Sequence, residues 1–226
     1  MKWTEQISDD VLEILMPYTE WFFSNDLSAL NEIARVKDSK KHDMNSACGE
    51  EYLKEIVDKD GDHEGYPEVS YCVDIGMLDH IEYNRDYLDY VFEHQSKQRE
   101  MSSELSAFLG ARNQAVNVYY PEKGFMGWHN NWNAHGYNIL LSYSKDGNGF
   151  FRYRDPKTHE IVTMNDKLGW SCKVGYYGRG REPDKVYYHC AASNSPRLTL
   201  GFIIPDIEMW RSMIEDISGE DASHFN

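Results

Sequence analysis

The sequence predicts an α+β protein with a mainly β core: helices come first, a jelly roll or small barrel follows, and one helix closes the chain. Three observations predict this fold. Apolar residues recur at helical spacing in the first half, short strand-like runs fill residues 114–204, and an amphipathic pattern returns after Pro205-Asp206. We expect one compact domain in three parts: a helical part at 1–113 packed on the core, the β core at 114–205, and a helix with an acidic tail at 206–226.

The first half carries the helical signals. Apolar residues from Val11 to Tyr18 lie at helical spacing after Ser8-Asp9-Asp10, which is typical of a helix start. Pro17 is expected to end this helix, so that Glu20–Phe23 forms a short strand. Further helices are expected at 28–35, 46–57, 78–94 and in a stretch ending at Leu109, where Gly110 suits the position after a helix.

The second half changes to strands with glycine-rich turns, such as Asp146-Gly147-Asn148-Gly149. Eight short strands at close spacing indicate a jelly roll or small barrel. They are Ala115–Tyr120, Phe125–Trp128, Tyr137–Tyr143, Phe150–Tyr153, Ile161–Met164, Trp170–Tyr177, Val186–Cys190 and Arg197–Ile204. A closing helix is expected from the spacing of Ile207, Trp210, Ile214 and Ile217.

Composition narrows the class of protein. The chain has 226 residues with 38 acidic and 23 basic side chains, a net charge of −15, and the acidic excess falls mainly before residue 110. This balance argues against a nucleic-acid partner without excluding one, because such binding depends on Lys and Arg. No apolar run is long enough for a membrane span, the start lacks the apolar stretch of a signal peptide, and the four cysteines lack CxxC spacing. We therefore expect a cytoplasmic protein without a membrane partner.

Three short motifs in the β region carry chemistry. Trp128-His129-Asn130-Asn131 ends one expected strand, Tyr187-Tyr188-His189 lies on another, and Arg197-Leu198-Thr199 opens the next. Two histidines on separate strands of a jelly roll can converge on one metal ion. An Arg-x-Thr beside them can hold the carboxylate of a bound acid through the guanidinium and the hydroxyl.

These motifs resemble those of the Fe(II)/2-oxoglutarate-dependent oxygenases. That family has His-x-Asp, a distant His, and an Arg or Lys about ten residues later followed by Ser or Thr; this chain has His129-Asn130-Asn131, His189, Arg197 and Thr199. Asn117-Val118-Tyr119 lies where some members carry an Asn-x-Tyr that touches 2-oxoglutarate. The resemblance covers residues 114–204. The wording around Gly127-Trp128-His129 and Phe151–Pro156 also looks like phage-type members, which would place the protein in the host cytoplasm.

The resemblance implies a double-stranded β-helix and a dioxygenase that hydroxylates a small-molecule or peptide substrate, with succinate and CO2 as co-products. It implies His129, Asn131 and His189 as the Fe(II) ligands and catalytic residues. It implies Arg197, Thr199, Asn117 and Tyr119 as the residues that bind 2-oxoglutarate, with O2 as the second co-substrate. The substrate itself does not follow from the sequence.

Asn131 departs from the family, which has a carboxylate at this position. Its amide oxygen can ligate iron as a neutral group, or the position can belong to water or an anion, as in halogenases of the family. A third possibility is a non-catalytic jelly roll that serves as a binding module or as part of a larger assembly such as a virion. His135 either replaces the missing ligand or is an ordinary loop histidine, which we favour. Arg152, Arg154, Arg179 and Arg181 either rim the mouth of the barrel or form a solvated face.

Overall fold

The computed structural model describes residues 1–4, 6–36, 43–59, 65, 67–80, 85–111, 114–131, 135–178 and 182–225. The helices are α1 (Asp9–Ser24), α2 (Ser28–Val36), α3 (Met44–Ala47), α4 (Glu50–Asp58), α5 (Leu88–Leu109) and α6 (Ile207–Ser218), with short 3-10 helices η1 (Ile75–His80), η2 (Arg85–Tyr87) and η3 (Pro183–Lys185). The strands are β1 (Lys2–Thr4), β2 (Ser70–Tyr71), β3 (Val73–Asp74), β4 (Val116–Tyr120), β5 (Phe125–His129), β6 (Gly136–Ser144), β7 (Gly149–Arg154), β8 (Ile161–Asn165), β9 (Gly169–Tyr177), β10 (His189–Ser193) and β11 (Arg197–Ile204).

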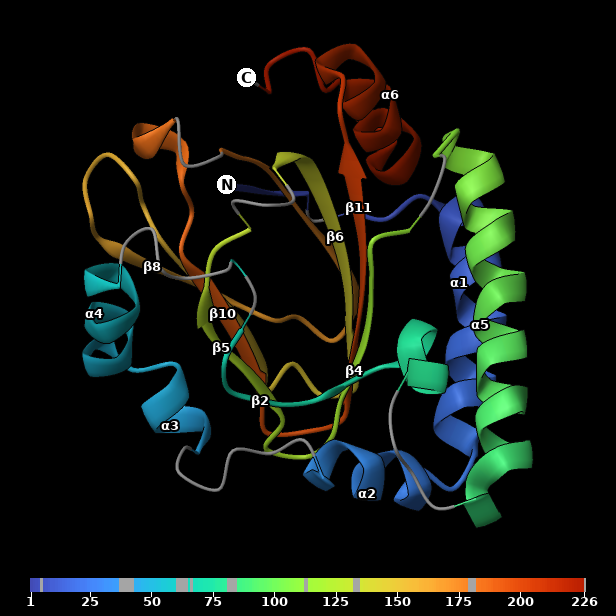
Figure 1. The fold of residues 1–226 in the computed structure, drawn as a ribbon. Helices are drawn as coiled ribbons and strands as arrows, with labels where there is room; N and C mark the ends of the chain where they lie inside the picture. Colours follow the sequence, from blue (N-terminus) through green and yellow to red (C-terminus); the bar gives the residue numbers. More distant parts are fainter. Residues whose placement is uncertain are drawn as a thin grey trace.

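The strands form two facing antiparallel sheets (Figure 1). Within the described residues, one sheet has the order β1-β9-β6-β11-β4-β3 and the other the order β2-β5-β10-β7-β8. From β4 to β11 the chain crosses repeatedly from one sheet to the other, which is the winding of a jelly roll. The eight expected strands of the core are all present, and the core is a double-stranded β-helix.

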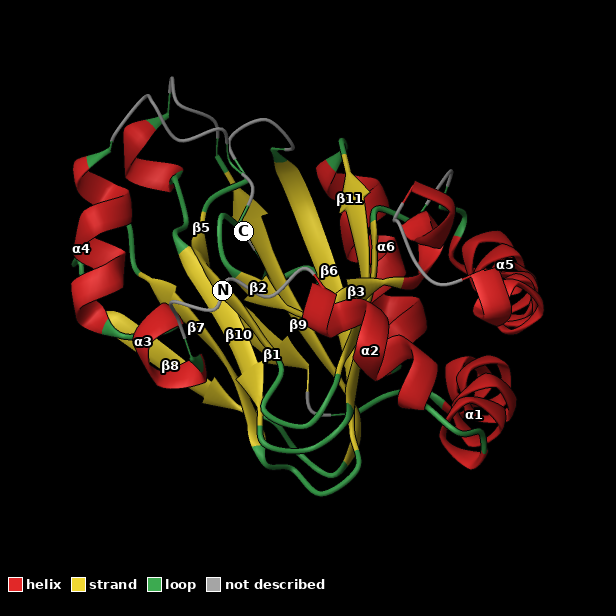
Figure 2. Cartoon of the chain, turned by 60° about the horizontal axis from the view of Figure 1, so that its bottom comes forward, coloured by secondary structure: helices red, strands yellow, loops and turns green. Residues whose placement is uncertain are grey.

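Helices cover the outer faces of both sheets (Figure 2). The helices α1, α2, α5 and α6 lie beside the six-stranded sheet, and α3 and α4 lie beside the five-stranded one. Apolar side chains from both layers fill the space between helices and sheet, and hydrogen bonds anchor the helices: Trp170 Nε1 donates to Thr19 Oγ1 at 3.1 Å and Trp210 Nε1 donates to the Asn138 carbonyl at 3.1 Å. The sheets are therefore buried outside as well as between them.

Two expectations for the first half are wrong. Helix α1 continues through Pro17 to Ser24, so Glu20–Phe23 is helical and not a strand. One proline removes a single backbone donor, and the burial of Tyr18 and Phe22 against the core outweighs that loss. The second expected helix begins only at Leu88, because 75–80 and 85–87 form 3-10 turns, while 81–84 lie outside the described residues.

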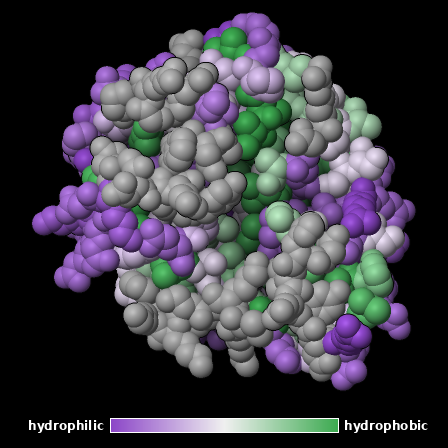
Figure 3. Space-filling view, viewed as in Figure 1, coloured by the Kyte–Doolittle hydropathy of each residue, from purple (hydrophilic) through white to green (hydrophobic). Residues whose placement is uncertain are grey.

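The N-terminal part also supplies strands that the sequence pattern did not indicate. The strands β1 and β3 extend the six-stranded sheet at its two edges, and β2 pairs with β5. Each has only two or three residues, too few for alternation to be readable. In Figure 3, which keeps the view of Figure 1, hydrophobic side chains reach the surface near the middle of this face, between the parts drawn in grey.

Candidate metal and anion site between the two sheets

Two histidines from neighbouring strands lie side by side. His129 ends β5 and His189 begins β10, and the two residues are direct partners in the antiparallel register. Both are buried, and their ring centroids are 4.2 Å apart. The His189 ring stacks on Phe151 of one sheet and on Tyr177 of the other, at 5.5 and 4.9 Å between centroids. The imidazole pair therefore faces the interior between the sheets.

A bulge in β5 sets the direction of His129. Between the pairs His189–His129 and Ala191–Met126, β5 has one residue more than β10. Such an extra residue resets the alternation of side chains and re-aims those that follow it. Gly127 fits here because a Cβ would lie 2.7 Å from a methyl carbon of Val69 and 2.9 Å from its carbonyl oxygen. The glycine before Trp128-His129 therefore has a structural reason.

The same nitrogen of each ring is held by its own strand. Nδ1 of His129 lies 2.8 Å from the Gly127 carbonyl oxygen, and Nδ1 of His189 lies 3.0 Å from the Tyr187 carbonyl oxygen. A carbonyl accepts only, so each Nδ1 carries the proton and each Nε2 carries the lone pair. Metal-binding histidines are oriented in this way. Burial also lowers the pKa of His189 to about 4, and the ring is neutral at pH 7, as metal binding requires.

The third ligand is not a carboxylate. Among the described residues, no group of three His, Cys, Asp or Glu side chains could hold a metal ion. Asn131 lies two residues beyond His129, is half-buried, and makes no hydrogen bond within the described part of the chain. Its amide oxygen is a neutral donor for a hard cation. His135 is half-buried and follows three residues that lie outside the described ranges.

A buried charge cluster lies on strands of the six-stranded sheet. Arg197 of β11 donates from Nε to Asp166 Oδ2 at 2.7 Å, and Lys173 of β9 donates from Nζ to Asp166 Oδ1 at 3.0 Å. The guanidinium also donates to Thr199 Oγ1 at 2.5 Å and to Ser142 Oγ at 3.1 Å. The three charged side chains are at most 1% exposed. The structure therefore brings Arg197 and Thr199 together and adds two ionic residues that the motif did not contain.

The cluster holds one positive charge more than it balances. Burial raises the pKa of Asp166, but Arg197 and Lys173 outweigh this effect and keep that pKa below its ordinary value. Burial lowers the pKa of Lys173 to about 8, against the pull of Asp166, so Lys173 is still mainly protonated at pH 7. Two cations thus share one carboxylate. Burying an unbalanced charge is costly, and an incoming carboxylate would balance it.

Asn117 and Tyr119 do not lie with this cluster. On β4 they pair with Leu200 and Leu198, whose side chains belong to the core between the sheet and its helices. Successive strand residues face opposite sides, so Arg197 and Thr199, which pair with Tyr120 and Val118, face the interior. The Tyr119 hydroxyl instead donates to Asn31 Oδ1 at 2.9 Å. The expected contact of Asn117 and Tyr119 with 2-oxoglutarate is therefore wrong.

Sequence reasoning missed several residues of this interior. Tyr120 lies beside the Arg197 guanidinium, 5.0 Å from its central carbon to the ring centroid. The Tyr177 hydroxyl is buried without a hydrogen-bond partner, next to His189. Asp166 and Lys173 carried no recognisable spacing, since their pairing depends on the register between strands. A buried aspartate between two Gly-rich turns was the available signal.

The remaining arginines do not form an interior group. Arg152 donates to the Cys48 carbonyl at 3.0 Å and to Thr163 Oγ1 at 3.1 Å, beside α3 on the outer face. Arg154 is half-buried, and Arg179 and Arg181 lie outside the described residues.

No protein-family model matches the chain, and no curated protein sequence matches it significantly. Three solved structures are similar. A Pseudomonas putida prolyl-4-hydroxylase shares 18% identity over 68% of this chain and 84% of its own, with a TM-score of 0.30. A rice dioxygenase for auxin oxidation shares 11% over 88% and 71%, with a TM-score of 0.31. A full-length Neurospora crassa protein in complex with α-KG shares 10% over 88% and 72%, with a TM-score of 0.34. Similarity this low carries no activity over to this chain.

Within the described residues, none of the helices combines the length and apolar character that crossing a bilayer requires.

Proposed function

We propose that this protein is an iron(II)- and 2-oxoglutarate-dependent dioxygenase that hydroxylates a small-molecule or peptide substrate. The observation that carries the proposal is the buried pair His129 and His189, with both Nδ1 atoms bound to backbone carbonyls and both Nε2 lone pairs available for a common ion. Two oriented, neutral imidazoles of this kind suit a first-row metal ion.

The donor set fits iron(II) with one neutral oxygen. His129 and His189 would supply two nitrogens, and Asn131 would supply its amide oxygen in place of the usual carboxylate. Iron(II), when bound together with 2-oxoglutarate and O2, supplies the oxidising chemistry that hydroxylates a C–H bond, with succinate and CO2 as co-products. The protein's part is to hold the metal ion and co-substrate and to keep water out.

The charge cluster fits one carboxylate of 2-oxoglutarate. Arg197 and Lys173 supply two positive charges against the single Asp166, and Thr199 adds a hydroxyl donor. A carboxylate bound here would make the cluster neutral. Tyr177, with its unpartnered hydroxyl beside His189, would donate a hydrogen bond to an oxygen of the co-substrate or the substrate.

Titration with Mn(II) followed by an assay for succinate release tests the proposal. We expect one Mn(II) site per chain in the wild type, loss of that site in His129→Ala and His189→Ala, and an unchanged site in the exposed control His224→Ala. His135→Ala should also keep the site, because Asn131 is assigned the third position. Unaltered Mn(II) binding in both His129→Ala and His189→Ala would refute the assignment.

A non-catalytic binding or structural role is the second candidate. Two observations favour it: the described residues offer no carboxylate ligand, and Arg197 is already paired with Asp166. In that case neither Mn(II) nor 2-oxoglutarate binds the wild type at millimolar concentration, while Asn131→Asp creates a metal site. An active oxygenase instead binds Mn(II) as wild type, and Asn131→Asp tightens this binding about tenfold, since an anionic oxygen holds a hard cation better than a neutral one.

We place the protein in the cytoplasm. The four cysteines are free and buried, which fits a reducing compartment.

A further inference from the structure

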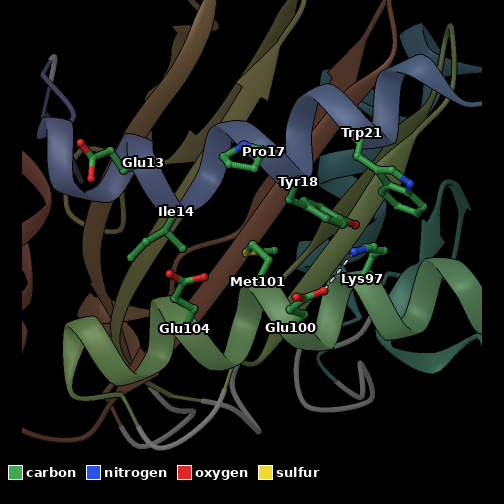
Figure 4. A pocket seen from close by; sticks show the side chains of 9 residues that line it. All are labelled: Glu13, Ile14, Pro17, Tyr18, Trp21, Lys97, Glu100, Met101 and Glu104. Atoms are coloured by element: carbon green, nitrogen blue, oxygen red, sulfur yellow. Dashed lines mark hydrogen bonds and ion pairs between the residues drawn. The ribbon is translucent and has the colours of Figure 1, made fainter.

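A groove lies on the outside of the molecule, away from the strands that carry the two histidines. It runs between α1 and α5 and has a volume of about 300 Å³ (Figure 4). Tyr18 and Met101 form its buried floor, and Glu13 of α1 and Glu104 of α5 extend from opposite walls at one end. Trp21 closes the other end.

The groove offers acceptors for which the protein has no donor. Lys97 is paired with Glu100 at 3.2 Å, so these two charges cancel. Within the described residues, Glu13 and Glu104 form no ion pair, which leaves two negative charges. Pro17 lines the same groove, and because it has no N–H, the Glu13 carbonyl lacks its usual helical hydrogen bond.

A buried hydroxyl is the second, independent observation. The Tyr18 side chain is 5% exposed, and its hydroxyl has no hydrogen-bond partner. In Figure 4 this hydroxyl lies in the space between the two helices, towards Trp21. An unpartnered buried hydroxyl is rare and indicates a group that the protein itself does not provide. The neighbouring Trp21 ring is a surface to which cations bind.

We propose that this groove binds an elongated primary alkylammonium compound, either a free polyamine or a lysine side chain. One ammonium group lies between Glu13 and Glu104, the methylene chain lies along Ile14 and Met101, and the far end reaches Tyr18 and Trp21. The helical rise from residue 13 to residue 21 is about 12 Å, which suits an extended triamine better than a short diamine.

Calorimetric titration with spermidine tests the proposal. We expect one site per chain that weakens at high salt, because the carboxylates are exposed. Glu13→Gln and Glu104→Gln should each raise the Kd about three- to fivefold, and the double variant about tenfold or more. Glu20→Gln on α1 and Glu93→Gln on α5, exposed and outside the groove, should leave the Kd unchanged and so control for unspecific attraction to an acidic protein.

Further arms separate the two sources and exclude a structural effect. Putrescine should bind more weakly than spermidine, whereas a lysine-containing peptide that binds more tightly than spermidine would assign the groove to a lysine side chain. Tyr18→Phe, which keeps the ring in the core, should weaken spermidine at an unchanged melting temperature. No binding of either compound, or equal weakening by Glu20→Gln and Glu104→Gln, would overturn the proposal.

Discussion

Asp166 is the residue whose removal tests the interior most directly. Its carboxylate accepts from Lys173 Nζ at 3.0 Å and from Arg197 Nε at 2.7 Å, and all three side chains are closed to water. Asp166→Asn keeps the volume and one oxygen but removes the charge, so that two buried cations remain side by side. Breaking a buried ion pair by removing one partner costs about 3–5 kcal/mol. We expect the free energy of unfolding at pH 7 to fall by that amount.

Urea denaturation of Asp166→Asn and of the exposed control Asp184→Asn measures this effect. The control should change the free energy of unfolding by less than about 0.5 kcal/mol. The variant should also respond differently to pH. Burial already lowers the pKa of Lys173 to about 8, and removal of Asp166 lowers it further. Between the folded and unfolded pKa the unfolded chain holds the extra proton, so stability rises with pH, and in the variant this rise begins at lower pH.

Two results would refute this account of the cluster. One is a loss of less than about 1 kcal/mol, which would mean that water reaches the three side chains. The other is a stability difference between wild type and variant that stays constant from pH 7 to pH 9. The difference is the useful quantity, because the contributions of Tyr and Cys residues common to both proteins cancel in it. Addition of 2-oxoglutarate should stabilise Asp166→Asn more than the wild type.

Three smaller perturbations test other parts of the structure. Burial lowers the pKa of His94 to about 4, so wild-type stability should fall as pH drops from 6.5 to 4, by up to about 3 kcal/mol from this group, and His94→Phe should remove that part of the slope. Tyr119→Phe loses the hydrogen bond to Asn31 and should cost about 1 kcal/mol in urea denaturation; weaker 2-oxoglutarate binding would contradict its place on the outer face. Gly110→Ala should lower stability by about 1 kcal/mol, since φ is 69° after α5; an unchanged melting temperature would argue against this cap.

The β core was predictable because its signals are local. Alternation of apolar residues and glycine-rich turns marks each strand without reference to the others. The pairing of His129 with His189 was an expectation from two motifs, and the structure brings the two rings together. The bulge at Gly127, which directs His129 inwards, was not predictable, because it depends on how β5 meets β10.

The faces of single strands were less accessible. Asn117 and Tyr119 were expected at the anion site, yet β4 turns both towards the helices. A shift of one residue moves a side chain to the other face of a sheet, and only the register decides it. The continuation of α1 through Pro17 has a similar origin: the packing of Tyr18 and Phe22 on the core outweighs a local helix-breaking signal.

The charges of the interior predict how a metal ion and 2-oxoglutarate would influence each other. His129, His189 and Asn131 are neutral ligands, and the cluster of Asp166, Lys173 and Arg197 has one net positive charge. A divalent ion alone would add to that charge, whereas the 2-oxoglutarate dianion offsets it. Each ligand should therefore raise the affinity of the other by the same factor. Mn(II) titrations with and without 2-oxoglutarate measure this factor, which Asn131→Asp should reduce because its carboxylate already supplies the missing charge; independent binding in the wild type would show that the interior is not balanced in this way.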